Sequence, residues 1–134
     1  MGVIREATVA GVTMANFRAA LGRGCIAVAQ CASCGHQQAI PSETCFNCGS
    51  GQLTVRDHPG GGRVFSWVVN HYAFAPELVG QTPYTVLLVT LDGGGRVYGR
   101  LAADVAKPME ADMPLALDAG STREHGYPVY RPAG

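Results

Sequence analysis

The sequence predicts a mainly β protein, with a short helix near its start, a small cysteine-bearing ribbon and a C-terminal barrel. Two Cys-x-x-Cys pairs, separated by ten residues, stand in the first half of the chain. Turn-forming residues are frequent, with 18 glycines and 8 prolines among 134 residues. In the second half such turns alternate with runs rich in valine, leucine and threonine, which is typical of short strands. A chain of this length has room for one modest core.

A short amphipathic helix is expected after Thr13, in the sequence TMANFRAALGRG. Threonine is a favourable N-cap, and Gly22 and Gly24 are typical stop signals. Spacings of three and four residues put three apolar side chains on one stripe: Met14, Phe17 and Leu21. The stripe must be covered either by this chain or by another protein, so these residues are candidates for partner binding. Residues 1–12 show no periodicity, and residues 1–24 are expected to be a tail followed by the helix.

The cysteine pairs predict one closed metal site. Two Cys-x-x-Cys turns that face each other supply four sulfurs to a tetrahedral zinc ion, here from Cys31, Cys34, Cys45 and Cys48. Glycine follows each pair, at Gly35 and Gly49, where a positive φ lets backbone N–H groups turn toward the sulfurs. Two disulfides or a redox dithiol are the alternative, but a redox pair needs no second copy. Iron fits the same four thiolates, so the spacing favours zinc as the cofactor without fixing the metal.

Residues 25–56 are expected to form a rubredoxin-like zinc ribbon around this site. Residues 25–30 enter as a strand, and residues 51–58 return as another. Cys25 is not needed in a four-coordinate site and is expected to be a small buried hydrophobe instead of a nucleophile. His36, two residues after a predicted ligand, is expected on the ribbon surface.

Residues 57–134 are expected to fold as a barrel. Apolar runs separated by turns predict five strands, at residues 63–72, 83–91, 96–101, 113–120 and 126–132. A loop over residues 73–82 follows the first strand, and Gly99 inside the third indicates a bulge or a close backbone approach. The connection over residues 102–112 is expected to contain one helical turn. Five strands with such a long connection fit the small Greek-key barrel called the OB-fold.

The charge of the chain argues against nucleic acid as a partner. Lysine and arginine number ten, and so do aspartate and glutamate. The barrel region, residues 57–134, carries six lysines and arginines against eight aspartates and glutamates. Phosphate contacts supply most non-specific affinity for nucleic acid, so a slightly acidic barrel is a poor candidate. The first residues contain no apolar run long enough for a signal peptide or a membrane span, and the reducing cytoplasm is the expected location.

Few residues invite a catalytic role. The glycine-rich turns at residues 60–62 and 93–95 precede no helix, so they are expected to be hairpin turns and not phosphate-binding loops. No Ser/His/Asp order or paired-carboxylate pattern is evident, and no catalytic residue is assigned. His71, at the end of the first long barrel strand, is the best single candidate for a general base or a ligand contact.

Several stretches together resemble a known family. They are the helix and glycines NFRAALGRG, the pairs CASCG and CFNCGS, the strands GRVFSWVVNH, PYTVLLVTLDGG and RVYGRL, and the closing YRP. In this order, over about residues 13–132, they are similar to the small zinc-ribbon and OB-fold proteins first catalogued as domain of unknown function thirty-five, which are associated with acyl-CoA. One departure is Asp112, which stands where the family usually has a glycine before the penultimate strand.

The resemblance implies a non-catalytic or co-catalytic subunit of an acyl-CoA-processing complex. Its partner would be a thiolase-like acyltransferase or aldolase, or a hotdog-fold enoyl-CoA hydratase, in a hetero-oligomer that helps to hold CoA. Because CoA carries phosphates, three arginines are candidate substrate contacts together with His71: Arg23, Arg63 and Arg100. A single-stranded nucleic-acid-binding module is the alternative function, and a free-standing acyl-CoA hydrolase or carrier is a third.

Overall fold

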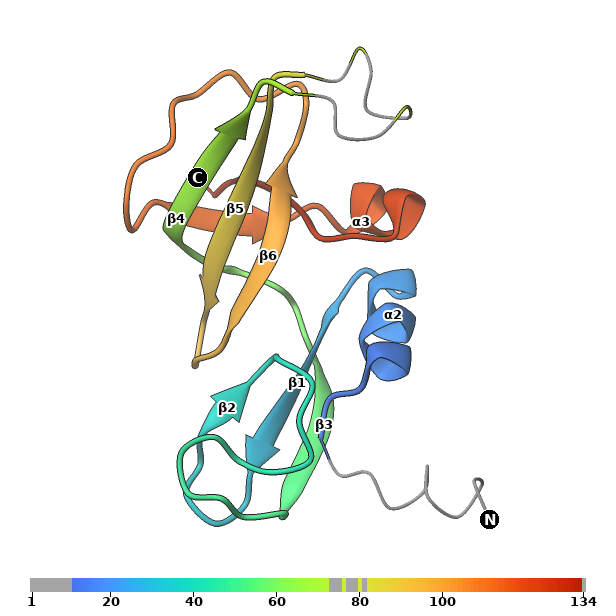
Figure 1. The fold of residues 1–134 in the computed structure, drawn as a ribbon, viewed down its shortest axis with the longest axis vertical. Helices are drawn as coiled ribbons and strands as arrows, with labels where there is room; N and C mark the ends of the chain where they lie inside the picture. Colours follow the sequence, from blue (N-terminus) through green and yellow to red (C-terminus); the bar gives the residue numbers. More distant parts are fainter. Residues whose placement is uncertain (1–10, 73–75, 77–79, 81, 134) are drawn as a thin grey trace.

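Two β structures are joined in one chain, as the sequence predicts. The computed structural model describes residues 11–72, 76, 80 and 82–133. In Figure 1 a three-stranded sheet forms the lower half, a closed barrel forms the upper half, and two helices lie along one side. Most of the expected tail at residues 1–12 and of the expected loop at residues 73–82 lies outside the described residues. No helix in the described ranges is both long and apolar enough to cross a membrane.

Helix α2, Met14–Gly22, begins where the sequence predicts. The Thr13 side chain accepts a hydrogen bond from the Asn16 backbone N–H at 3.0 Å, and Asn16 Oδ1 accepts one from the Thr13 backbone N–H at 2.7 Å. This reciprocal pair satisfies two backbone donors that the start of a helix otherwise leaves free. Gly24, with a φ of 76°, then turns the chain from the helix toward the first strand.

The three-stranded sheet carries the two cysteine pairs and has the form expected of the ribbon. Its strands are antiparallel, in the order β2-β1-β3, with the bounds β1 Ile26–Cys31, β2 Gln37–Gln38 and β3 Leu53–His58. Strand β1 is buried on both faces. Ile26 and Val28 belong to the core shared with the barrel, whereas Ala27 and Ala29 belong to the smaller core of the ribbon.

The barrel is the closed OB-fold that the sequence predicts. Its strands are β4 Gly62–Asn70, β5 Tyr84–Leu91, β6 Arg96–Leu101, β7 Pro114–Leu117 and β8 Val129–Pro132. They close in the order β4-β5-β6-β8-β7, with β7 antiparallel to β4 and β8 parallel to β6. Gly99 marks a close approach, since a Cβ atom there would lie 2.8 Å from Tyr130 Cδ2.

The helix of the barrel lies elsewhere than the sequence indicates. Residues 102–112 contain turns and no helix, so the helical turn expected there is wrong. Helix α3, Ala119–His125, instead overlaps the end of the segment expected as the fourth barrel strand. Asp118 accepts a hydrogen bond from the Ser121 N–H at 3.0 Å as the N-cap, and Gly126, with a φ of 77°, ends the helix. The helix sequence AGSTREH has no apolar stripe, so the two cap residues are the only sequence features that indicate this helix.

One hydrophobic core runs from the ribbon into the barrel. It combines buried residues from α2, β1 and all five barrel strands, among them Leu21, Ile26, Val28, Val64, Leu87, Val97, Leu115 and Tyr130. The Tyr130 side chain is fully buried, and its hydroxyl donates to the Gly60 carbonyl at 2.8 Å. Because Gly60 lies between β3 and β4, this bond fixes the connection between the ribbon and the barrel.

Two buried polar side chains fasten the ribbon to the β5–β6 turn, residues 92–95. Gln37 Nε2 donates to the Asp92 carbonyl at 3.1 Å and to the Gly94 carbonyl at 2.8 Å. His58 Nδ1 accepts from the Gly60 N–H at 2.8 Å, so Nε2 carries the proton and donates to the Asp92 carbonyl, also at 2.8 Å. Gln37 and His58 are buried, and hydrogen bonds formed away from water hold the two parts firmly together.

Replacing Gln37 with leucine is expected to lower the free energy of unfolding by about 1–3 kcal/mol, because two buried carbonyl groups lose a donor. Urea unfolding followed by circular dichroism measures this. Gln30, which lies opposite Gln37 in the sheet and is exposed, is the matched control. Gln30→Leu should change the stability by less than about 0.5 kcal/mol. Equal losses in the two variants would contradict the role given to Gln37.

Asp112 adopts a backbone conformation that favours glycine. Its φ is 62°, the one positive φ of a non-glycine residue within the described ranges. The Asp112 N–H donates to the Val64 carbonyl at 2.9 Å, which ties this turn to β4 and holds the conformation. The left-handed region costs most side chains about 1–2 kcal/mol, and less for aspartate. Asp112 therefore stands at a position whose backbone conformation suits the glycine that the family resemblance leads one to expect there.

Asp112→Gly is expected to raise the free energy of unfolding by up to about 1 kcal/mol. Glycine relieves the backbone strain of the folded state, and this gain outweighs the stability lost because the unfolded chain becomes more flexible. Asp112→Ala should lower it, because alanine keeps the Cβ atom and lacks the polar side chain that eases this conformation. Thermal unfolding of the two variants beside the parent measures both effects. A destabilised glycine variant would show that the aspartate side chain itself holds the turn.

Candidate functional site

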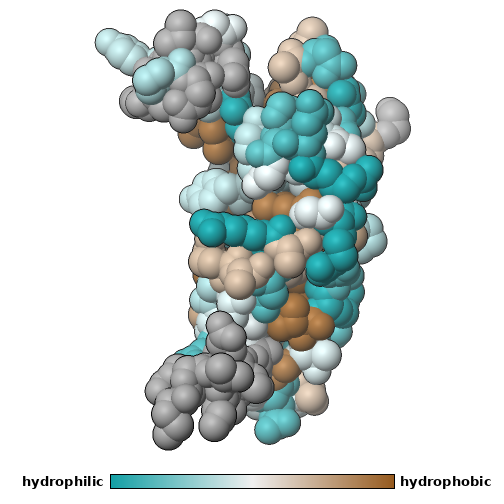
Figure 2. Space-filling view, turned by 90° about the vertical axis from the view of Figure 1, so that its right-hand side faces the viewer, coloured by the Kyte–Doolittle hydropathy of each residue, from teal (hydrophilic) through white to brown (hydrophobic). Residues whose placement is uncertain are grey.

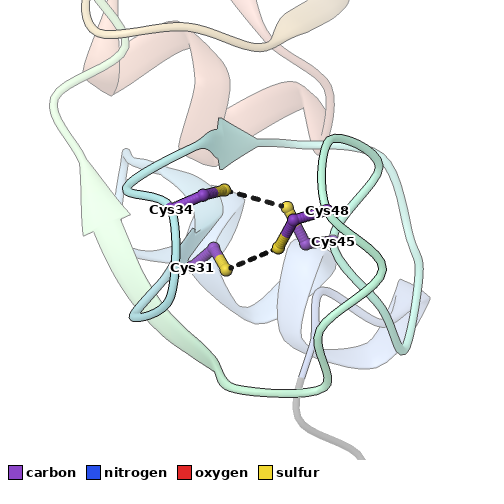
Figure 3. Close-up of side chains that lie close together, drawn as sticks. All are labelled: Cys31, Cys34, Cys45 and Cys48. Carbon is purple, nitrogen blue, oxygen red and sulfur yellow. Dashed lines mark hydrogen bonds between the residues drawn. The ribbon is translucent and has the colours of Figure 1, made fainter.

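The two cysteine pairs meet at one end of the ribbon (Figure 3). Each pair lies in a turn closed by the glycine that follows it. The Gly35 N–H donates to the Cys31 carbonyl at 2.9 Å, and the Gly49 N–H donates to the Cys45 carbonyl at 2.8 Å. The φ angles are 80° at Gly35 and 78° at Gly49, as the sequence predicts for these two positions. Local turn chemistry therefore aims all four thiols at a common centre.

The spacing of the sulfur atoms fits a metal ion. All four Sγ atoms lie within 4.8 Å of one another. The Sγ atoms of Cys31 and Cys48 are 3.6 Å apart, and those of Cys34 and Cys45 are also 3.6 Å apart. Four thiolates bound at about 2.3 Å to a tetrahedral ion would be about 3.8 Å apart, whereas bonded sulfurs lie about 2.0 Å apart. The cluster can thus hold a metal ion, and none of its cysteines is in a disulfide.

The electrostatics of the cluster also favour a cation. The pKa of Cys31 falls to about 6, chiefly because the Cys34 backbone N–H hydrogen-bonds to its sulfur. The Ser50 N–H lowers the pKa of Cys48, but the Cys31 sulfur and burial outweigh it and raise that pKa to about 12. Without a positive charge, one thiol can ionise only if its neighbour stays protonated. Four thiolates at these distances require a bound cation.

Asn47 is a supporting residue that the sequence prediction missed. Its backbone N–H donates to Cys45 Sγ at 3.4 Å, and its side-chain Nδ2 donates to Cys34 Sγ at 3.5 Å. Asn47 thereby links the two pairs and is the main cause of a lowered pKa at Cys34. Such hydrogen bonds orient metal ligands. His36 lies outside the group of side chains close enough to share a metal with the cysteines.

The outer side of β4, β5 and β6 is an exposed apolar surface. Residues that lie directly opposite each other on neighbouring strands point to the same side of the sheet. Val64, Leu87 and Val97 are buried, so they and the residues paired with them point into the barrel, and the alternate residues point outward. The outward side carries six apolar or aromatic residues, which we call the barrel face: Phe65, Val68, Tyr84, Val86, Leu88 and Tyr98. Val68 is 60% exposed and Tyr98 is 71% exposed. Large apolar side chains gathered at such exposure mark an interaction surface.

Arginines accompany the barrel face. The Arg96 guanidinium carbon lies 3.8 Å from the centre of the Phe65 ring, and that of Arg100 lies 4.2 Å from the centre of the Tyr84 ring. Arg63 and Arg96 both lie opposite Thr90 of β5, so they point to the same outward side of the sheet. Strands β4, β5 and β6 contain no aspartate or glutamate. This surface is therefore locally cationic, although the barrel region as a whole is slightly acidic.

The four candidate substrate-binding residues have different surroundings. Arg23 forms an ion pair with Asp57 at 2.7 Å, which ties the end of α2 to β3. Arg63 donates to a backbone carbonyl before β7 at 2.9 Å. His71 directly follows β4 and is exposed. Arg100 lies at a cavity on the barrel and packs against two tyrosine rings. Of the four, Arg100 is in the setting best suited to a ligand.

The apolar stripe of α2 is covered mainly by this chain. Leu21 is 4% exposed and lies in the main core, and Phe17 packs against both hydrophobic cores. Met14 is 54% exposed, so it alone of the three is freely available to a partner. In Figure 2, which looks onto the helices, the surface over α3 is mainly hydrophilic and the surface over α2 is more hydrophobic. The partner contact expected of this helix is thus reduced to Met14 and its exposed neighbours.

Histidine side chains form no catalytic pair within the described ranges. In that part of the chain no hydrogen bond joins a histidine ring to a serine, threonine or cysteine side chain. His58 binds backbone groups through both ring nitrogens, and His125 stacks on Tyr127 with 5.3 Å between ring centres. Cys25 is half-buried against the ribbon core, with its Sγ 3.8 Å from the Arg23 carbonyl. The geometry gives it no activating base.

Comparison with known sequences identifies relatives of the chain. A family model described as the C-terminal OB-fold domain of ChsH2 matches residues 55–119. The chain is 33% identical over 109 residues to a probable enoyl-CoA hydratase alpha subunit from Thermomonospora curvata. That match covers 81% of this chain and 34% of the relative, so the chain spans about a third of the relative's length.

Solved structures share the architecture. A chain from the Ltp2-ChsH2(DUF35) aldolase is 28% identical, with a TM-score of 0.71, and the match covers 92% of this chain and 98% of that one. A protein of unknown function from the DUF35 family of Sulfolobus solfataricus is 10% identical, with a TM-score of 0.63 and coverage of 89% and 84%, which shows a likeness in fold alone. With its cysteine cluster, its barrel and these relatives, the chain belongs to the DUF35 family of OB-fold proteins that includes the C-terminal domain of ChsH2.

Proposed function

We propose that this chain is an accessory subunit of an acyl-CoA-processing enzyme. The partner is a thiolase-like acyltransferase or aldolase, or an enoyl-CoA hydratase of the hotdog fold. Two relatives support this assignment: one matched chain comes from an aldolase complex with Ltp2, and another relative is described as an enoyl-CoA hydratase subunit. The subunit docks on the enzyme and helps to hold its acyl-CoA, and it performs no turnover alone.

The barrel face is the observation that carries the proposal. Its centre is apolar: Val68 lies opposite Val86 on β5, and Leu88, two residues further along β5, lies opposite Tyr98 on β6. Arginines lie beside it, and the three strands contribute no carboxylate. A protein surface with an apolar centre and acidic or carbonyl groups at its rim would complement both features. An enzyme partner therefore accounts for this surface, and the exposed side of α2 around Met14 is a second place for contact.

Zinc is the metal that we assign to the cysteine cluster. Four thiolates, two of them from buried cysteines, leave no open coordination position, which is the arrangement of structural zinc sites. Cys31, Cys34, Cys45 and Cys48 would hold the ion, and Asn47 would orient two of them. The bound zinc would supply the folding free energy that the small ribbon lacks. Its role is to shape the ribbon.

A second candidate function, binding of single-stranded nucleic acid, is favoured by the distribution of charge. OB-folds bind oligonucleotides on the side of their second and third strands, which here correspond to β5 and β6. Tyr98, Arg96 and Arg100 lie there together, and aromatic and cationic groups of this kind grip single strands. The arginines are few for such a groove. A gel shift with single-stranded DNA at several salt concentrations separates this candidate from the accessory subunit.

The chain is expected to co-purify as a stable complex with a thiolase-like enzyme or an enoyl-CoA hydratase of the same organism, and to raise that enzyme's activity on acyl-CoA. Val68→Asp should weaken the complex at least 30-fold, equivalent to about 2 kcal/mol, because it buries a charge at the centre of the interface. Calorimetric titration of the two purified proteins measures the affinity. Thr54→Asp, an exposed change on the ribbon strand β3, is the control and should leave it unchanged.

Four results would count against these assignments. If Val68→Asp binds like the parent, the barrel face is not the interface, whereas failure of the parent to bind either enzyme rejects the accessory role. Turnover of acyl-CoA by the pure chain would also reject it. Salt-sensitive binding of DNA, without binding to either enzyme, would favour the second candidate.

Purified protein is expected to contain about one equivalent of zinc, and Cys34→Ser should bind little metal and be poorly soluble. Structural zinc contributes on the order of 10 kcal/mol to folding, so loss of a ligand leaves the ribbon largely unfolded. Cys25→Ser is the matched control, since Cys25 lies outside the cluster. Elemental analysis and circular dichroism provide the measurements. Folded protein with well under one equivalent of any metal would overturn the assignment.

A further inference from the structure

A cavity of about 760 Å³ opens on the side of the barrel. It is bounded by the start of β5, the end of β6 with the residues after it, helix α3 and strand β8. The side chains that matter for its chemistry are Tyr84, Arg100, Leu101, His125, Tyr127 and Val129. A space of this size suits an organic ligand and is much larger than a simple inorganic anion needs.

Arg100 is the cation of this cavity that is free to meet a ligand. Its guanidinium carbon lies 4.2 Å from the centre of the Tyr84 ring and 5.3 Å from that of Tyr127, and Nη1 donates to the Tyr127 hydroxyl at 3.2 Å. No carboxylate within the described ranges forms an ion pair with it. Two rings and one hydrogen bond therefore hold the guanidinium in place, while its remaining N–H donors stay available for an oxyanion.

The other arginine at the cavity is already neutralised. Arg131 Nη1 lies 3.0 Å from a carboxylate oxygen of Asp104, and its Nε lies 2.7 Å from one of Asp118. The Ser121 backbone N–H and then Arg131 lower the pKa of Asp118 to about 2, so this carboxylate stays ionised at neutral pH. Arg131 therefore belongs to a structural network at the start of α3. Among the described lining residues, the unpaired positive charge comes from Arg100.

The remaining lining suits a ligand with flat and apolar parts. Tyr127 stacks on His125 and presents an aromatic surface beside the guanidinium. Leu101 and Val129 contribute aliphatic side chains. A ligand with an anionic group, an aromatic ring and a flexible chain would match the guanidinium, the rings and the aliphatic lining respectively.

We propose that this cavity binds the phosphorylated adenosine part of CoA, with a phosphate on Arg100 and Tyr127. The assignment rests on the proposed function, in which the subunit helps to hold acyl-CoA, and names the part of the ligand and the residues involved. Arginine forks bind phosphate oxygens through paired hydrogen bonds, and a guanidinium fixed in advance loses little freedom on binding. The pantetheine arm and its acyl group would extend away from Arg100, toward the partner enzyme.

The test compares three ligands by calorimetric titration into the zinc-loaded chain: CoA, adenosine 3′,5′-bisphosphate and pantetheine. Arg100→Gln should weaken CoA and adenosine 3′,5′-bisphosphate by about tenfold or more, since a charge-assisted hydrogen bond is lost. Pantetheine has no phosphate, so its affinity should not change. Tyr127→Phe removes the hydroxyl that holds the guanidinium and should give a smaller loss, confined to the same two ligands.

Arg96→Gln is the matched control. Arg96 lies on the same strand and the same side as Arg100, and it also packs over an aromatic ring, but it is not part of the cavity lining. Its variant should bind all three ligands like the parent. Equal weakening by Arg96→Gln and Arg100→Gln would indicate a general charge effect and overturn the proposal. So would unchanged binding in folded Arg100→Gln, or no CoA binding by the parent, whereas complex formation with the enzyme tests the accessory role separately.

Discussion

Strand β1 is the element on which both halves of the molecule depend, because both of its faces are buried. One face places Ile26 and Val28 in the core that fills the barrel. The other places Ala27, Ala29 and Cys31 in the core of the ribbon, beneath α2. A strand buried on both sides fixes the layers above and below it at once, since close-packed interiors transmit displacement. The hydrogen bonds of Gln37 and His58 to the β5–β6 turn then set the orientation of the ribbon on the barrel.

Features set by neighbours in the sequence could be predicted, and features set by distant packing could not. The cysteine cluster follows from Cys-x-x-Cys-Gly turns, and α2 follows from its N-cap and its stripe. The stripe could not show what covers it, and the structure places Leu21 in the core while Met14 stays exposed. Helix α3 was missed because its sequence has no apolar stripe, although Asp118 and Gly126 are ordinary cap residues. Asn47 lies between two ligands in the sequence, and only the folded turn brings its side chain to the opposite pair.

The net charge of the barrel region and the charge of its individual surfaces lead to different conclusions about ligands. The net charge of the barrel region is an average over all of its surfaces, and by that average it repels nucleic acid. Alternation along β6 nevertheless places Arg96, Tyr98 and Arg100 on one side, and β4 and β5 add apolar residues beside them. The sequence RVYGRL already contained this pattern, because every second residue of a strand points the same way. An argument from net charge therefore excludes general attraction to phosphate, and it leaves open a specific site built from one or two arginines.

The positions of the cysteine cluster and of Arg100 separate the two kinds of chemistry that the chain can support. The cluster lies in the ribbon, which forms the lower half of Figure 1, whereas Arg100 is the penultimate residue of β6 in the barrel. A metal ion held by these four thiolates would have no open position and would lie away from the cavity, so it would act on the shape of the ribbon and not on a ligand bound beside Arg100. The barrel in turn offers one fixed cation, aromatic rings and an exposed apolar face, which are groups that bind and position. Under the proposed function, the chemistry on a bound thioester would come from the partner enzyme, and this chain would hold the substrate for it.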